Sequence, residues 1–209
     1  MYFAMGVDIA AKSYTGKYTC TTLGLCGVPP MARRRGAFLL ALLLSAGFAA
    51  AADWRPAVPD ARQVGSGEFT WFGFRVYTAR LWSAGSPQGW QAPFALELIY
   101  HRALSRDTLV QASLDEMRRL SDRQLPQPTQ DRWAQAMQAA FVDVQPGTRI
   151  TGVYLPGQGS RFYVDGQLRH EVADPAFARA FFAIWLDPRA RDPALRQRLL
   201  GLAGNDRGE

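Results

Sequence analysis

An apolar segment at residues 37–50 divides the chain into two parts of different character. Its sequence is AFLLALLLSAGFAA, it follows the basic stretch MARRRG at residues 31–36, and AAD completes it at residues 51–53. A basic start, an apolar run of about 7–15 residues and small residues at a cleavage point are typical of a secretory signal peptide. The run is shorter than the roughly 20 residues that a helix needs to cross a bilayer. We therefore expect a signal peptide at residues 31–52, export to the periplasm, and no stable membrane anchor after cleavage.

Residues 1–30 show neither a helical nor an alternating period, so we expect an unstructured extension without a function. A start codon assigned too far upstream, with Met31 as the true initiator, explains this best; a genuine extension is the alternative. Both cysteines, Cys20 and Cys26, lie here, so residues 53–209 contain none. Disulfides, thiol catalysis and cysteine-ligated metals are therefore excluded from that part.

The charge of the remaining part argues against nucleic acid as a partner. Residues 1–52 contain five of the 24 basic and one of the 18 acidic residues, which leaves a net charge of +2 on residues 53–209. A nucleic-acid-binding domain has a strongly basic footprint, and this one is nearly balanced. Its length suits a single domain of ordinary size.

Residues 53–209 show strand patterns and helix patterns that do not alternate strictly. Aromatic and β-branched residues with glycine punctuation predict strands at residues 69–82 (one or two strands), 94–102, 149–155 and 161–164, with a tight turn at Asp165-Gly166. Capping residues and apolar periodicity predict helices that start after Ser105, Thr129, Asp174 and Asp192, the last ending at Gly201. Because strict βα units are missing, we expect an α+β fold with an antiparallel sheet.

The candidate binding residues lie mainly on the predicted strands. Arg75 and Tyr77 are two positions apart, as are Tyr100 and Arg102, so each pair shares one face of its strand. A planar guanidinium beside a phenol suits a carboxylate or an enolate-like oxygen at the end of an apolar pocket. Trp133, on an apolar helix face, is a fifth candidate. Two alternatives stay open: strand arginines are more often solvated or ion-paired, and buried aromatic residues more often serve packing alone.

Residues suited to catalysis or metal binding are few. His101 lies on the opposite strand face from Tyr100, on the side of Glu97, where the two form either an acid–base pair or a plain surface pair. His101 and His170 together do not make a metal site. No phosphate-binding loop or nucleophile-elbow motif is present. We therefore expect no metal and no cofactor, and we assign no catalytic residue.

An ordered set of motifs resembles the bacterial chalcone isomerase-like domain. The motifs are GSGEF (65–69), VYTARLW (76–82), LELIY (96–100), GTRITGVY (147–154), FYVDG (162–166) and FFAIWLDP (181–188). The resemblance implies an open-faced β-sandwich, in which a large antiparallel sheet has helices packed on one face with a cleft between them. The enzymatic branch needs neither metal nor redox cofactor.

The resemblance also bears on catalysis. The enzymatic branch closes the ring of a chalcone with an Arg, a strand Thr, and a helix that presents Tyr, Lys and Asn at spacings of three and seven. Aligned on this chain, the Arg position falls at Gly65 or Ser66, the Thr position near Tyr77, and the helix positions at Trp133, Ala136 and Ala140. None of these supplies the expected donor, which argues against chalcone cyclisation. Other branches are non-catalytic and include fatty-acid binders in which Arg and Tyr hold a carboxylate.

The sequence therefore predicts an exported chalcone isomerase-like domain protein that binds a small apolar or amphipathic ligand, such as a fatty acid, without converting it. The first alternative is an isomerase (an intramolecular lyase) on an unknown substrate, with Arg75 or Arg102 stabilising an enolate. The second is an accessory protein of an envelope pathway that has no pocket.

Overall fold

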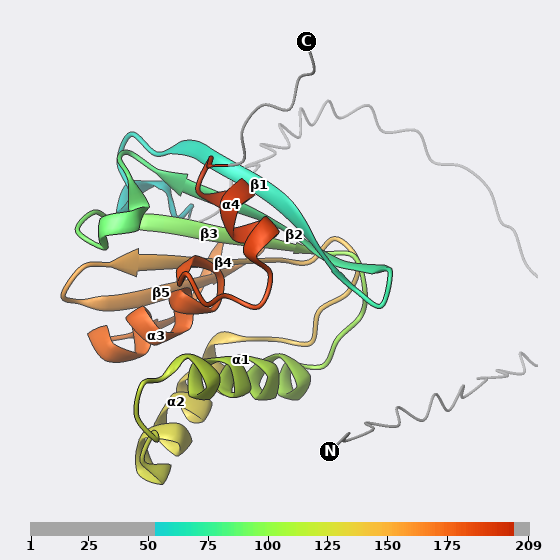
Figure 1. Cartoon of the computed structure of the whole chain (residues 1–209), viewed down its shortest axis with the longest axis vertical. Coiled ribbons are helices and arrows are strands. Elements are labelled where there is room, and N and C mark those ends of the chain that lie inside the picture. Colours follow the sequence, from blue (N-terminus) through green and yellow to red (C-terminus); the bar gives the residue numbers. More distant parts are fainter. Residues whose placement is uncertain (1–52, 203–209) are drawn as a thin grey trace, which may run out of the picture. The chain divides into compact units, whose positions relative to one another are not determined.

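The alternating and aromatic-rich segments form one antiparallel sheet. The computed structural model describes residues 53–202, and in it each strand pairs with its neighbour along the chain (Figure 1). The six strands are β1 (Arg62–Trp71), β2 (Phe74–Ser83), β3 (Phe94–Tyr100), β4 (Arg149–Leu155), β5 (Gly159–Val164) and β6 (Gln167–Val172). The predicted α+β class, with an antiparallel sheet, is confirmed.

The strand predicted at residues 69–82 is two strands joined by a two-residue turn. β1 ends at Trp71 and β2 begins at Phe74, and these two residues pair with each other. The turn residues Phe72 and Gly73 have φ values of 48° and 78°. Positive φ at both central positions is what a type I′ hairpin turn requires. The same geometry occurs at Asp165-Gly166, where the sequence predicted a tight turn.

The helices are α1 (Arg106–Leu120), α2 (Gln127–Ala140), α3 (Pro175–Leu186) and α4 (Pro193–Leu199). Three predicted caps are confirmed: Ser105, Asp174 and Asp192 each accept a hydrogen bond from a backbone N–H of the first turn. The predicted cap at Thr129 is wrong. α2 begins earlier, after Pro126, whose carbonyl accepts from the Thr129 N–H at 2.9 Å, so Thr129 already lies inside the helix.

One face of the sheet packs against the helices and encloses the main core. Alternate residues of β3, from Phe94 to Tyr100, are buried on this face. α3 packs on β4 and β5, α4 lies on β1, and α1 packs against α3 and α2 (Figure 1). The opposite face has a smaller cluster in which Trp54 and Val58 cover Ala95 and Val153. Within residues 53–202, no helix has both the length and the apolar character needed to span a bilayer.

Candidate functional site

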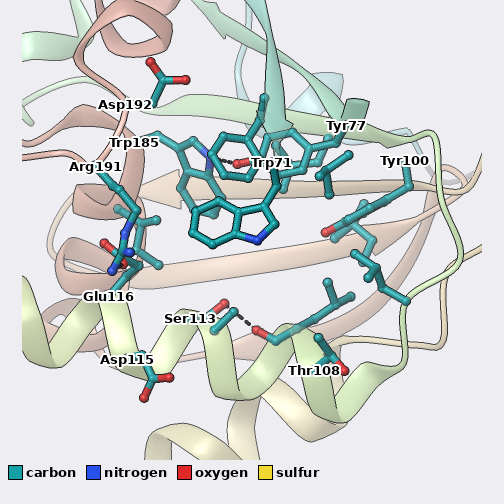
Figure 2. A pocket seen from close by; sticks show the side chains of 18 of the residues that line it. Trp71, Tyr77, Tyr100, Thr108, Ser113, Asp115, Glu116, Trp185, Arg191 and Asp192 are labelled. Atoms are coloured by element: carbon teal, nitrogen blue, oxygen red, sulfur yellow. Dashed lines mark hydrogen bonds and ion pairs between the residues drawn. The ribbon is translucent and has the colours of Figure 1, made fainter. Parts of the chain in front are cut away.

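A cavity of about 410 Å³ lies between the inner face of the sheet and the helices (Figure 2). β1, β2 and β3 supply one wall, including Phe69, Tyr77, Leu98 and Tyr100. α1 and α3 supply the other, including Leu109, Ala112, Ile184 and Trp185. Small-molecule sites in proteins are mostly apolar clefts of about 300–1,000 Å³. In size and lining, this cavity is such a site.

The cavity exists because α1 presents small side chains toward the sheet. On one stripe of α1, Val110, Leu114 and Met117 are buried in the core. On the neighbouring stripe, Ala112 and Ser113 line the cavity, and the Ser113 hydroxyl donates to the Leu109 carbonyl at 2.8 Å. Leu109, Ala112, Ser113 and Glu116 are linked by spacings of three and four, so they share one side of the helix, and the small side chains of Ala112 and Ser113 leave space there.

Two tyrosine rings form part of the sheet wall. The Tyr77 ring stacks on Phe69 with centroids 5.0 Å apart, and its hydroxyl accepts a hydrogen bond from the Trp185 indole N–H at 3.0 Å. Burial raises the pKa of the Tyr77 phenol, and the hydrogen bond from Trp185 only partly opposes this. Tyr77 is therefore a neutral group whose position is fixed by Trp185.

Tyr100 has a neutral hydroxyl that is available to a ligand. Its ring meets the Tyr77 ring edge-on at 5.9 Å, and its hydroxyl points into the cavity (Figure 2). Burial raises the pKa of this phenol far above its usual range, so the group keeps its proton. Among residues 53–202, no side chain or backbone group hydrogen-bonds to this hydroxyl. A hydroxyl of this kind can donate to an oxygen of a bound molecule.

Charged groups lie at the other end of the cavity (Figure 2). The Glu116 carboxylate, largely buried, is in contact with the guanidinium of Arg191 and lies 2.8 Å from that of Arg119. The Asp192 carboxylate accepts from the Leu195 N–H at 2.8 Å and caps α4. The charges thus neutralise one another or cap a helix, and the walls between them and Tyr100 are apolar.

The structure brings two of the five candidate binding residues to the cavity. Tyr77 and Tyr100 line it, while Arg75, Arg102 and Trp133 lie outside its lining. The Arg75 side chain is exposed and pairs with Glu68 at 3.3 Å. The Arg102 guanidinium lies over the Phe74 ring, 4.8 Å from its centroid.

The expected clamp of strand arginines is therefore not formed at this cavity. Arg75 is the second residue of β2, next to the hairpin turn and beyond a register shift in its pairing with β1. Arg102 follows Tyr100, the last residue of β3, so strand alternation no longer sets its direction. Trp133 is a core residue of α2: it is buried, and its indole N–H donates to Asp174 at 3.0 Å.

His101 and Glu97 do not pair with each other on the outer face of the sheet. His101 Nε2 lies 2.8 Å from the Thr78 hydroxyl. The buried Glu97 carboxylate lies between Arg80 at 3.4 Å and Arg149 at 3.3 Å. This arrangement explains the burial of Glu97 by ion pairing and gives no sign of an acid–base pair.

Sequence reasoning missed the helix residues of the site. Leu109 and Ser113 belong to the helix that was predicted to start after Ser105, and they line the cavity, whereas Met117 of the same helix is buried in the core. The two consecutive small residues Ala112-Ser113 were the available signal. Arg191 comes from the segment between α3 and α4, and no sequence pattern indicated its position.

Comparison with known proteins gives the family. A family model described as chalcone isomerase-like matches residues 65–201, which is more than half of the chain. The chain belongs to the chalcone isomerase-like family. An uncharacterized protein of Haemophilus influenzae is similar to it, with 30% identity over 151 residues that cover 72% of this chain and 69% of the relative. A fatty-acid binding protein of Arabidopsis thaliana has a similar fold, with a TM-score of 0.54 at 12% identity over 68% of this chain and 87% of that one.

The positions that this chalcone isomerase-like protein presents to its cavity differ from the donor set of the family's enzymatic branch. The helix that faces the cavity is α1, and not α2, where the alignment had placed the Tyr, Lys and Asn positions. Its cavity-lining residues at spacings of three and seven are Leu109, Ala112 and Glu116. At Gly65, a Cβ atom would lie 1.9 Å from the Arg198 carbonyl oxygen. α4 thus occupies the space that a side chain at Gly65 would need.

Proposed function

We propose that this protein is exported and binds a small apolar or amphipathic molecule, such as a fatty acid, without converting it. The observation that supports this most directly is the cavity, whose apolar walls end at one neutral, unpartnered hydroxyl on Tyr100. Burial of the ligand's apolar part against Phe69, Leu98 and Ile184 would supply most of the affinity, at about 25 cal/mol per Å². The Tyr100 hydroxyl would donate a hydrogen bond to the ligand's polar end.

Binding is favoured over catalysis by the groups that line the cavity. Ring closure or a related isomerisation requires donors aimed at a developing oxyanion. Among the described residues that line the cavity, the arginine is Arg191, and its guanidinium is in contact with the Glu116 carboxylate. The α1 positions hold Leu109 and Ala112, which cannot donate a hydrogen bond from their side chains. The export part of the proposal rests on the basic and apolar pattern of residues 31–52.

A pocket-filling variant tests the site. Ala112 is exposed on α1 and lines the cavity, so Ala112→Trp should obstruct it. We expect the affinity for the fluorescent fatty acid cis-parinaric acid to fall at least about tenfold, equivalent to about 1.4 kcal/mol. The matched control is Ala139→Trp, an exposed alanine of α2 outside the cavity, which should bind as the wild type does. Equal binding by Ala112→Trp and the wild type, or no binding by the wild type, would refute the proposed site.

A second variant tests the polar contact. Tyr100→Phe removes the hydroxyl alone, and a hydrogen bond to a charged carboxylate contributes about 1.5–3 kcal/mol. We therefore expect binding at least about tenfold weaker. Tyr163→Phe, which alters a tyrosine of the opposite sheet face, is the control and should leave binding unchanged. If the two variants bind alike, Tyr100 does not contact the ligand.

Two measurements address the remaining parts of the proposal. Mass determination of the protein from a periplasmic fraction should show a chain that starts near residue 53; a full-length cytoplasmic chain would contradict export. Incubation with a panel of chalcones should leave their absorbance constant. Loss of that absorbance, together with formation of the ring-closed product, would make the protein an isomerase.

A further inference from the structure

The turn between β1 and β2 exposes an unusual group of aromatic side chains. Trp71, Phe72 and Phe74 are 49%, 85% and 60% exposed. We call residues 71–74 the aromatic tip. Scattered exposed apolar residues are ordinary, but a contiguous group marks a binding surface. In Figure 1 this hairpin extends past the end of β3, away from the helices α2 and α3.

The backbone at the tip is unfavourable for the residue that occupies it. Phe72 has a φ of 48°, a left-handed conformation that Gly and Asn adopt easily and that a bulky side chain adopts only at a cost of about 1 kcal/mol or more. A turn optimised for stability would have Asn-Gly at Phe72-Gly73. The chain instead holds a phenylalanine almost fully in solvent at this position, which points to a role outside the fold.

The tip is continuous with the cavity. Trp71 belongs to the tip and also lines the cavity, together with Phe69. The Phe69 ring stacks on Trp71, with centroids 6.4 Å apart, and on Tyr77 at 5.0 Å. An apolar molecule that enters beside Trp71 therefore meets aromatic surface from the tip to the interior.

Basic side chains flank the tip. The Arg102 guanidinium stacks on the Phe74 ring at 4.8 Å and has no acidic partner among residues 53–202. Arg75 lies next to Phe74 in sequence, and its charge is partly offset by Glu68 at 3.3 Å. Aromatic residues with adjacent arginines suit the headgroup region of an anionic bilayer, where the rings enter the interface and the guanidinium meets phosphate.

We propose that the aromatic tip docks on the surface of a phospholipid bilayer that contains anionic lipid. The tip is three side chains on one turn, too small for the roughly 1,000 Å² that a specific protein–protein interface or a stable dimer buries. A bilayer interface needs only such shallow, local insertion. This docking goes beyond the proposed binding function, and it brings the part of the cavity wall that Trp71 forms close to the bilayer, where apolar molecules are most concentrated.

The test is co-sedimentation with vesicles of phosphatidylethanolamine and phosphatidylglycerol, without added ligand. The key variant is Phe72→Asn, because an Asn-Gly turn should make the hairpin more stable while it removes the most exposed ring. Lower vesicle binding with an equal or higher unfolding midpoint therefore cannot result from misfolding. We expect the partition coefficient to fall about fivefold to tenfold.

Two further variants sharpen the result. Leu168→Ser removes an exposed apolar side chain from β6, at the opposite edge of the sheet, and should leave vesicle binding unchanged. Arg102→Gln should weaken binding to anionic vesicles by about fivefold and leave binding to pure phosphatidylcholine vesicles unchanged. All variants share one N-terminus, so any contribution of the apolar segment at residues 37–50 is common to them.

The outcomes separate docking from the other possibilities. No vesicle binding by the wild type, or equal binding by Phe72→Asn, overturns the proposal. A molecular mass in solution that drops from dimer to monomer on Phe72→Asn, without vesicle binding, also overturns it and assigns the tip to a second copy. Vesicle binding by a protein that retains no fatty acid would support the docking and contradict the proposed binding function.

Discussion

Replacing Asp174 with alanine should destabilise the protein by about 2–4 kcal/mol, because this carboxylate joins two helices. Its Oδ1 accepts hydrogen bonds from the N–H groups of Ala176 and Phe177 at 2.9 and 3.0 Å, and so caps α3. Its Oδ2 accepts from the indole N–H of Trp133, on α2, at 3.0 Å. The ion pair with Arg132 at 3.7 Å involves an exposed guanidinium and adds little.

The magnitude is the sum of two known effects. Loss of an N-cap side chain costs about 1 kcal/mol, within a range of about 0.5–2. A buried donor left without a partner costs about 1–3 kcal/mol, and the Trp133 indole is buried. Asp174→Asn should cost less than the alanine variant, because asparagine caps a helix well. It should still cost something, because the amide nitrogen of asparagine cannot accept a hydrogen bond from the Trp133 indole N–H.

Urea denaturation measures these effects. With a slope of about 2 kcal/mol per molar, Asp174→Ala should lower the midpoint by about 1–2 M at an unchanged slope. A double-mutant cycle with Trp133→Phe should give a coupling free energy of about 1–2 kcal/mol. Additive effects of the two substitutions would refute the link between the helices, and so would a midpoint shift below about 0.3 M for Asp174→Ala.

Two further predictions concern packing and acid stability. Gly65→Ala should lower the free energy of unfolding by about 1–3 kcal/mol, since its Cβ would lie 1.9 Å from the Arg198 carbonyl oxygen. Gly85→Ala, with open space around the new Cβ, is the control and should be nearly neutral. Equal midpoints of the two variants in urea denaturation would show that α4 moves aside at little cost. Hydrogen bonds from Arg189 hold the pKa of the Asp187 carboxyl below its usual range, despite partial burial. This carboxylate therefore stabilises the fold above a pH of about 4, the pKa of an aspartate in the unfolded chain, and its contribution is lost as the pH falls further. Asp187→Asn should therefore lower the free energy of unfolding at pH 7 and make little difference near pH 2; a deficit independent of pH would contradict this sign.

The strands and helix starts that could be predicted from the sequence are those marked by a clear local pattern, such as apolar alternation or a capping residue. The alternating apolar residues of β3 face the core, and Asp174 and Asp192, each followed by proline and a helix-forming run, cap the starts of α3 and α4. Thr129 misled because a threonine near a helix start resembles a cap, although the turn had already begun after Pro126.

The site could be predicted only in part. Tyr77 and Tyr100 were found because strand alternation fixes their direction. Arg75 and Arg102 were misplaced because they lie at strand ends, where a register shift and the end of pairing cancel that alternation. The hollow itself depends on how far α1 lies from the sheet, and periodicity shows only that a helix face is turned inward, not whether it meets a packed core or a space.

The packing of the last helix on the first strand has a consequence for folding during synthesis. Every sheet contact links neighbours along the chain, so the hairpins can form in order, as the segments emerge. The cavity cannot, because Leu195 and Trp185 close a wall that Phe69 and Trp71 begin. A chain that emerges segment by segment therefore completes the cavity last, after α4 has joined β1.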